Sequence, residues 1–138
     1  MNRSWTPLLL AWLVATAATL GALFLGEVMG MTPCVLCWYQ RIFMFPIALI
    51  LGIACFTDDR RGAIYGLALA LGGLGVAGYH TLLVAGLTPK AWVPCSAGVS
   101  CADQKLEILN GVQIPWLSLA AFMALAFLLI VYLRKSSR

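Results

Sequence analysis

Charged residues are scarce in this sequence, and their scarcity excludes a soluble protein. They make up only 10% of the 138 residues, whereas 62% of the chain is hydrophobic. Soluble domains typically contain about 25% charged residues. No stretch long enough for a separate soluble domain remains between the apolar runs. The composition therefore predicts an integral membrane protein.

Signatures of nucleic-acid, nucleotide and metal binding are also lacking. The glycines of the third apolar run are not part of a phosphate-binding loop, because the lysine and the strand of such a loop are missing. These glycines instead join two alanines in a series of small residues spaced three and four positions apart: Gly62, Gly66, Ala70, Gly73 and Ala77. Small residues in this pattern let membrane helices approach closely. The pattern predicts helix packing and no ligand.

Four apolar runs are long enough for the roughly 20 residues that a membrane-spanning helix needs. They cover about residues 5–29, 38–56, 63–87 and 115–133, within one membrane domain of residues 1–138. We expect an all-α membrane protein, a four-transmembrane-helix bundle. The first run follows Arg3 and could also be a signal peptide. Because it continues to Leu25, beyond the roughly 7–15 residues of a signal-peptide core, we expect a retained helix.

The basic residues predict the orientation of the bundle. Four crossings place most of them on one side: Arg3, Arg60, Arg61, Arg134, Lys135 and Arg138. The other side has only Lys90 and Lys105, and Arg41 lies inside the second span. Since basic residues are enriched in cytoplasmic segments, both termini are expected to be cytoplasmic. The loops at about 30–37 and 88–114 then face outward.

Four of the five cysteines fall in these two outward loops. They are Cys34, Cys37, Cys95 and Cys101. Disulfides form and persist outside the cytosol, so two disulfides or a pair of exchanging dithiols are expected. Cys55 follows Cys37 by 18 residues, which is roughly 27 Å along a helix. We therefore expect Cys55 to be a packing residue.

The sequence around the first cysteine pair favours a reactive thiol. Thr32 and Pro33 are typical of a helix N-cap followed by proline at the first helical position. Cys34 and Cys37 would then lie in the first turn, where the helix dipole favours a thiolate. Arg41, four residues after Cys37, shares its helix face. Arg41 is either an interfacial anchor whose charge reaches water or a functional charge, because charges inside membranes are costly.

At this point the sequence resembles a known family. The run CVLCWYQR, residues 34–41, with Ile42, Phe43, Met44 and Pro46 after it, looks like the signature of DsbB-type disulfide bond formation proteins, especially their short BdbC branch. The segment PCSAGVSC, residues 94–101, matches the second cysteine pair of that branch. The order of the four spans also matches over essentially the whole chain.

The resemblance implies a disulfide-generating oxidoreductase of the cytoplasmic (inner) membrane. Its partner would be an extracytoplasmic thioredoxin-fold dithiol oxidase, DsbA- or BdbD-like, and its electron acceptor a membrane quinone, ubiquinone or menaquinone. Cys95 and Cys101 would form the partner-facing disulfide, and Cys34 and Cys37 the quinone-facing one. The partner attacks Cys95, the released Cys101 attacks Cys34, and Cys37 is left as a thiolate. Arg41 would stabilise this thiolate and the charge developing on the quinone.

Two further residues are expected to bind the quinone. His80, the only histidine, lies roughly 10 Å inside the end of the third span, a depth similar to that of Arg41, so both could line one pocket. A hydrogen bond to a neighbouring helix explains a membrane histidine equally well. Trp38 belongs to the tryptophans near span ends that are typical of an interfacial belt, but it also neighbours Cys37.

The sequence also leaves alternatives open, some to this function and one about the conformation of the second loop. A quinone reductase of the vitamin K epoxide reductase type also has four helices and two cysteine pairs, but its C-x-x-C comes late in the chain. A thiolate-bound zinc or copper site, or a protein merely stapled by disulfides, gives no reason for Arg41. In the second loop, which is shorter than in the enteric branch, residues 102–109 fit a short amphipathic helix or a plain loop equally well.

Overall fold

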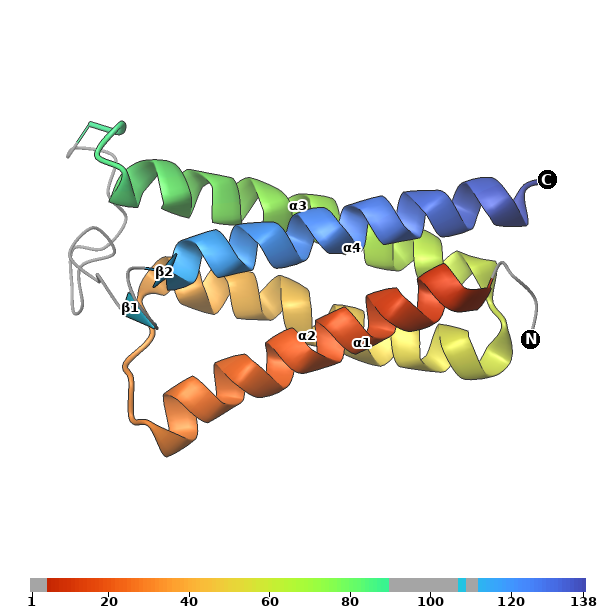
Figure 1. Cartoon of the computed structure of the whole chain (residues 1–138), viewed down its shortest axis with the longest axis horizontal. Coiled ribbons are helices and arrows are strands. Elements are labelled where there is room, and N and C mark those ends of the chain that lie inside the picture. Colours follow the sequence, from red (N-terminus) through yellow and green to blue (C-terminus); the bar gives the residue numbers. More distant parts are fainter. Residues whose placement is uncertain (1–4, 90–106, 109–111) are drawn as a thin grey trace.

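Four long helices form the molecule (Figure 1). The computed structural model describes residues 5–89, 107–108 and 112–138. The helices are α1 (Trp5–Leu23), extended by the π-helical turn η1 (Phe24–Val28), α2 (Val35–Thr57), α3 (Arg60–Val84) and α4 (Ile114–Ser136). Each is long and apolar enough to cross a membrane. The predicted four-helix membrane bundle is confirmed.

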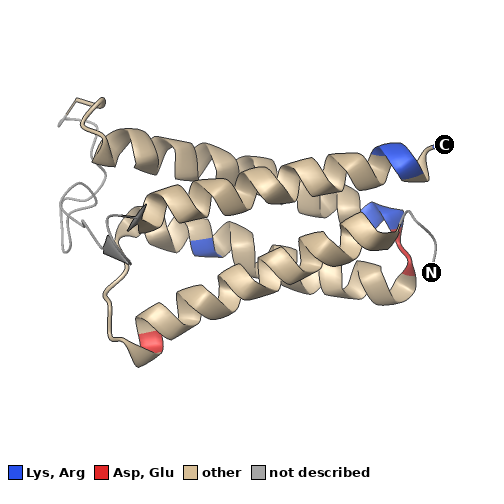
Figure 2. Cartoon of the chain, viewed as in Figure 1, with Lys and Arg blue, Asp and Glu red and all other residues tan. Residues whose placement is uncertain are grey.

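The helices are arranged as a closed ring in which each packs against two others. α1 contacts α2 and α4, and α3 contacts the same two helices from the other side. The start of α1, the turn between α2 and α3 and the end of α4 lie at one end of the bundle (Figure 1). The basic residues of the described part gather at this end, with the exception of Arg41 (Figure 2). The start of α2 lies at the opposite end.

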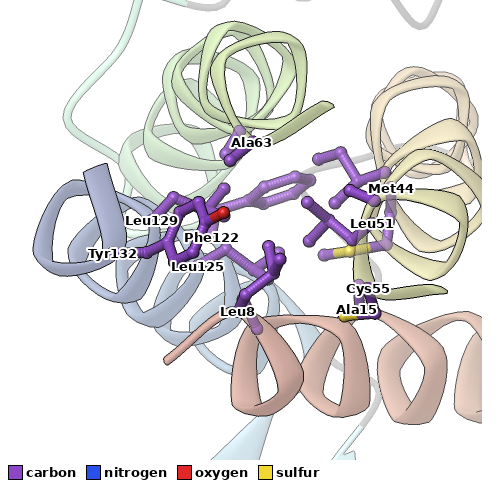
Figure 3. Packing of buried hydrophobic residues seen from close by; sticks show 14 of the residues in the cluster. Leu8, Ala15, Met44, Leu51, Cys55, Ala63, Phe122, Leu125, Leu129 and Tyr132 are labelled. Carbon is purple, nitrogen blue, oxygen red and sulfur yellow. The ribbon is translucent and has the colours of Figure 1, made fainter. Parts of the chain in front are cut away.

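The centre of the bundle is filled by side chains from all four helices. Phe122 of α4 is fully buried and lies among Leu8, Leu51 and Leu125 (Figure 3). The outward faces of the helices are also apolar, with residues such as Phe56 and Phe127 largely exposed. Since lipid tails are as apolar as these side chains, the exposed surface is suited to a membrane.

The predicted series of small residues on α3 is buried along its whole length, from Gly62 to Ala77. A Cβ atom at Gly73 would overlap the ring of Phe122, and one at Gly62 would approach the Cβ of Ala54 to 2.7 Å. The small residues therefore let α3 pack closely against α2 and α4. Cys55 is buried in the same core, as expected for a packing residue.

Three local predictions are corrected by the structure. α2 begins at Val35 with Cys34 as its N-cap, two residues later than Thr32 and Pro33 suggested, because the backbone of Cys34 is extended (φ −73°, ψ 171°). α3 ends at Val84, before the predicted residue 87, and is followed by Gly86 in the left-handed region (φ 76°).

The third correction concerns the end of the second loop. Strand β1 (Glu107–Ile108) pairs antiparallel with β2 (Val112–Gln113), directly before α4. The alternative of a helix is therefore wrong for residues 107–108. Residues 102–106 and 109 lie outside the described part of the chain, as do Cys95, Cys101 and Trp92.

Candidate active site

The first cysteine pair forms a compact dithiol at the start of α2. The Sγ atoms of Cys34 and Cys37 lie 3.2 Å apart, and both residues are free thiols. Cys34 is buried, with 2% of its surface exposed, whereas Cys37 is half-buried. The spacing follows from the helix, because an N-cap residue and the residue three positions later lie on one face of the first turn. The two sulfurs are therefore within reach of disulfide formation.

The dithiol favours a thiolate at Cys34. The hydrogen bond with the Cys37 side chain lowers the pKa of Cys34 from its ordinary value of about 9 to about 4. Burial opposes this change, and a hydrogen bond with His80 supports it. The sequence predicts a stabilised thiolate at Cys37, because Arg41 lies one turn away. In the dithiol, however, it is Cys34 at the helix N-cap that the surrounding groups favour as the anion.

His80 contacts the dithiol from α3. Its Nε2 atom lies 3.8 Å from the Sγ of Cys34, and the residue is almost fully buried. The contact was not anticipated, although a signal for it was present. His80 follows Ala77 by three residues and continues the buried face of small residues, so it points into the bundle. Because α3 ends earlier than predicted, His80 lies only four residues from the helix end, level with the start of α2.

Two residues that the sequence analysis assigned no role complete this cluster. The Nε2 of Gln40 lies 3.0 Å from the Nδ1 of His80, and the hydroxyl of Ser118 donates a 2.6 Å hydrogen bond to the Oε1 of Gln40. The chain of contacts therefore runs from Ser118 on α4 through Gln40 on α2 and His80 on α3 to Cys34. Gln40 lies within the run CVLCWYQR, and a polar side chain inside a membrane helix is itself a signal of a specific role.

Arg41 is held between two elements. Its Nη2 donates a 2.9 Å hydrogen bond to the carbonyl oxygen of Ala22 on α1. Its Cζ lies 5.4 Å from the ring centroid of Trp38, one turn earlier on α2, a distance that permits a cation–π interaction. A Cβ atom at Gly26 would lie 3.0 Å from the Nη2 of Arg41. The guanidinium therefore contacts Trp38, α1 and η1.

A cavity of about 440 Å³ opens between α1, α2 and α4. Its wall is mostly apolar and includes both Cys37 and Arg41, together with Gln40 and Ser118. Neither His80 nor Trp38 is among the described residues that line it. The expectation that Arg41 and His80 line a single pocket is therefore not met, because α3, which carries His80, contributes no described residue to the wall.

The donor atoms of Cys34, Cys37 and His80 all lie within 4.8 Å of one another. Two thiols and an imidazole are ligands that zinc accepts, so these distances alone would also suit a thiophilic metal ion. The same atoms already satisfy one another by hydrogen bonding.

Known proteins to which this chain is similar are described as disulfide formation proteins. The family model described as "Disulfide bond formation protein DsbB" matches residues 3–132. A "Probable disulfide formation protein" of Metapseudomonas resinovorans is 49% identical over 137 residues, which cover 99% of this chain and 95% of the relative. "Disulfide bond formation protein C" of Bacillus subtilis is 41% identical over 113 residues, 82% of each chain. A "Probable disulfide formation protein" of Deinococcus radiodurans is 44% identical and covers 94% of this chain and 89% of the relative.

Proposed function

Because this chain belongs to the DsbB family of disulfide bond formation proteins, a family of membrane thiol oxidoreductases, we propose that it reoxidises a thioredoxin-fold dithiol oxidase and passes the electrons to a membrane quinone. The chain is a multi-pass membrane protein. The proposal adds the electron acceptor, the partner and the order in which the four loop cysteines react.

The observation that carries the proposal is that one apolar cavity has both Cys37 and Arg41 in its wall. Its volume of about 440 Å³ lies within the range of roughly 300–1,000 Å³ typical of small-molecule sites. The apolar wall suits a lipophilic ring, and the few polar groups suit its oxygen atoms. A bound quinone would accept two electrons and two protons and leave as the quinol.

Each residue of the site has a role in this scheme. The half-buried Cys37 lies in the wall of the cavity. Arg41 places a fixed positive charge in the same wall, where it stabilises negative charge that develops on an acceptor oxygen. Trp38 acts on the quinone site through Arg41, which lies against its ring. His80 acts through Cys34.

The cysteines exchange in a relay in which every step is a thiolate displacing a sulfur. A thiolate of the partner attacks Cys95 and releases Cys101, which attacks Cys34 of the Cys34–Cys37 disulfide and releases Cys37. The second thiolate of the partner then frees Cys95, which attacks Cys101, restores the Cys95–Cys101 disulfide and releases Cys34. The partner leaves oxidised, and its two electrons now reside in the Cys34–Cys37 dithiol beside the cavity.

The orientation follows from charge. The end of the bundle that gathers the basic residues is proposed to face the cytoplasm. The start of α2 then lies at the outer surface of the cytoplasmic membrane, where an extracytoplasmic partner can reach the second loop.

The test is turnover with the purified protein in detergent, a reduced thioredoxin-fold dithiol protein and a soluble ubiquinone or menaquinone analogue. We expect quinone absorbance to fall while the partner is oxidised. Cys55→Ala is the matched control, since Cys55 is a buried core residue outside the relay. Partner oxidation without any quinone consumption would contradict the proposed acceptor.

The order of the second pair is tested by trapping. Cys101→Ala is expected to accumulate a mixed disulfide between Cys95 and the partner, because the resolving thiol is lost. Cys95→Ala removes the attacked sulfur and should trap none. The reverse pattern would exchange the roles of the two residues.

A further inference from the structure

We propose that Gln40 and Ser118 are positioning residues that fix the tautomer of His80, so that its Nε2–H group donates a hydrogen bond to the Cys34 thiolate. The proposal rests on the redox role of the Cys34–Cys37 dithiol put forward above. It assigns roles to the buried Gln40 on α2 and the partly buried Ser118 on α4, neither of which touches Cys34 in the contacts described.

The amide of Gln40 makes one contact with Ser118 and another with His80. The contact between Gln40 and Ser118 measures 2.6 Å, and that between Gln40 and His80 measures 3.0 Å. Hydrogen bonds between two oxygens are typically about 2.7–2.8 Å long, whereas those donated by N–H are about 2.9–3.0 Å. The short contact therefore belongs to the amide oxygen, which accepts from the Ser118 hydroxyl, and the longer one to the amide nitrogen.

The orientation of the amide determines which ring nitrogen of His80 carries the proton. The amide NH₂ group can only donate, so the Nδ1 of His80 must accept. In the neutral imidazole the other nitrogen then carries the hydrogen. Nε2, which faces the Sγ of Cys34 at 3.8 Å, is therefore the donor, and a sulfur anion is the acceptor that such a donor suits.

Burial strengthens the hydrogen bonds that connect Gln40, His80 and Cys34. Gln40, His80 and Cys34 are 6%, 1% and 2% exposed, so water does not compete for their hydrogen bonds. Among the described residues, the groups that shift the pKa of Cys34 are Cys37 and His80. Tyr79, also on α3, packs against the same cluster. α4 contributes the uncharged Ser118. The Cys34 sulfur thus has a hydrogen bond with His80 beside those with the side chain and the backbone of Cys37, and the His80 tautomer decides whether the first is donated to the thiolate.

Because His80 is the only histidine, labelling with ¹⁵N-histidine yields a single imidazole in NMR spectra, provided that the purification tag contains no histidine. In the reduced wild-type protein we expect a neutral ring protonated at Nε2. In Gln40→Leu the ring of His80 should no longer favour protonation at Nε2. The protonation equilibrium of Cys34 should then shift about tenfold toward the thiol, so that its pKa rises. The pKa is followed by the titration of [β-¹³C]cysteine, with the signal assigned from Cys34→Ser.

Ser118→Ala should change the His80 tautomer and the Cys34 pKa in the same direction as Gln40→Leu, by a smaller amount. If Gln40→Leu does not fold, Ser118→Ala alone tests the proposal. The matched control is Thr81→Val, which removes a buried hydroxyl next to His80 that, among the described residues, donates to the backbone of its own helix at Ala77. It should leave both readings unchanged. A wild-type ring protonated at Nδ1, or an unchanged tautomer in both network variants, would overturn the proposal. Neither reading needs quinone or partner, so a failure of turnover alone would overturn only the proposed function.

Discussion

The guanidinium of Arg41 on α2 is bonded to the carbonyl oxygen of Ala22 on α1, at 2.9 Å from its Nη2. This contact crosses from one helix to the other at the wall of the cavity that also includes Cys37. The hydrogen bond uses one of the five N–H donors of the guanidinium. Arg41 is therefore held against α1 at the wall of the cavity.

The first prediction concerns this charge. Arg41→Ala should raise the quinone concentration needed for half-maximal turnover and lower kcat/KM for quinone by about 10- to 100-fold, the effect of about 1.5–3 kcal/mol for a hydrogen bond to a charged group. Steady-state kinetics with a soluble quinone measure it. Arg60→Ala, at the far end of the bundle, is the control. Quinone kinetics like those of the wild type would return Arg41 to a purely structural role.

The second prediction moves Arg41 without replacing it. Gly26→Ala puts a methyl group 3.0 Å from the Nη2 and 3.3 Å from the Nη1 of Arg41, so the guanidinium must shift. Gly26 itself is not among the described residues of the cavity wall. We expect the Gly26→Ala protein to fold and its KM for quinone to rise. The rise should be smaller than in Arg41→Ala. Gly78→Ala, where a Cβ meets nothing within 4 Å, should behave as the wild type, and equal kinetics in both variants would count against the Arg41 geometry.

The third prediction is a pH dependence. Because the hydrogen bond with Cys37 lowers the pKa of Cys34 to about 4, Cys34 in the dithiol should be a thiolate above about pH 4 and become protonated only below it. Cys37→Ala removes this hydrogen bond and should move the transition upward toward the ordinary thiol range. Titration of [β-¹³C]cysteine in the reduced protein distinguishes the two. A Cys34 signal that titrates near pH 9 in the wild type would contradict the geometry.

The sequence predicts the helices well because hydropathy alone determines which segments enter lipid. It also predicts the place of the dithiol, the position of Arg41 one turn away and the packing of the small residues on α3. All of these depend on spacing within one helix or on composition. They need no knowledge of how the helices are rotated against one another.

The contacts between helices could not be predicted in this way. Gln40 and His80 are 40 residues apart and Gln40 and Ser118 are 78 apart, so their meeting depends on the rotation and depth of three helices. The π-helical turn at Phe24–Val28 also left no signal that hydropathy detects. α3 ends three residues earlier than predicted. The rotation of α3 directs His80 toward Cys34 and not into the cavity.

The fourth prediction tests the packing of α3. Gly73→Ala should lower the free energy of unfolding by about 1–3 kcal/mol, as expected for overpacking, because the new Cβ overlaps the ring of Phe122. Reversible unfolding in mixed detergent micelles measures the change. Gly75→Ala is the matched control, since a Cβ at Gly75 meets nothing within 4 Å. Equal stability of the two variants would contradict the close approach of α3 and α4.

The central claim is that the Cys34–Cys37 dithiol itself delivers electrons to the quinone through Cys37. The most direct measurement is a single turnover of a chain in which Cys95 and Cys101 are both replaced by alanine, reduced beforehand, freed of reductant and mixed with a soluble quinone. We predict that about one quinone per chain is consumed, as a two-electron couple requires, and that adding Cys37→Ser abolishes the reaction. Quinone consumption that persists in the Cys37→Ser chain, or its absence while Cys34 and Cys37 are intact, would contradict the account.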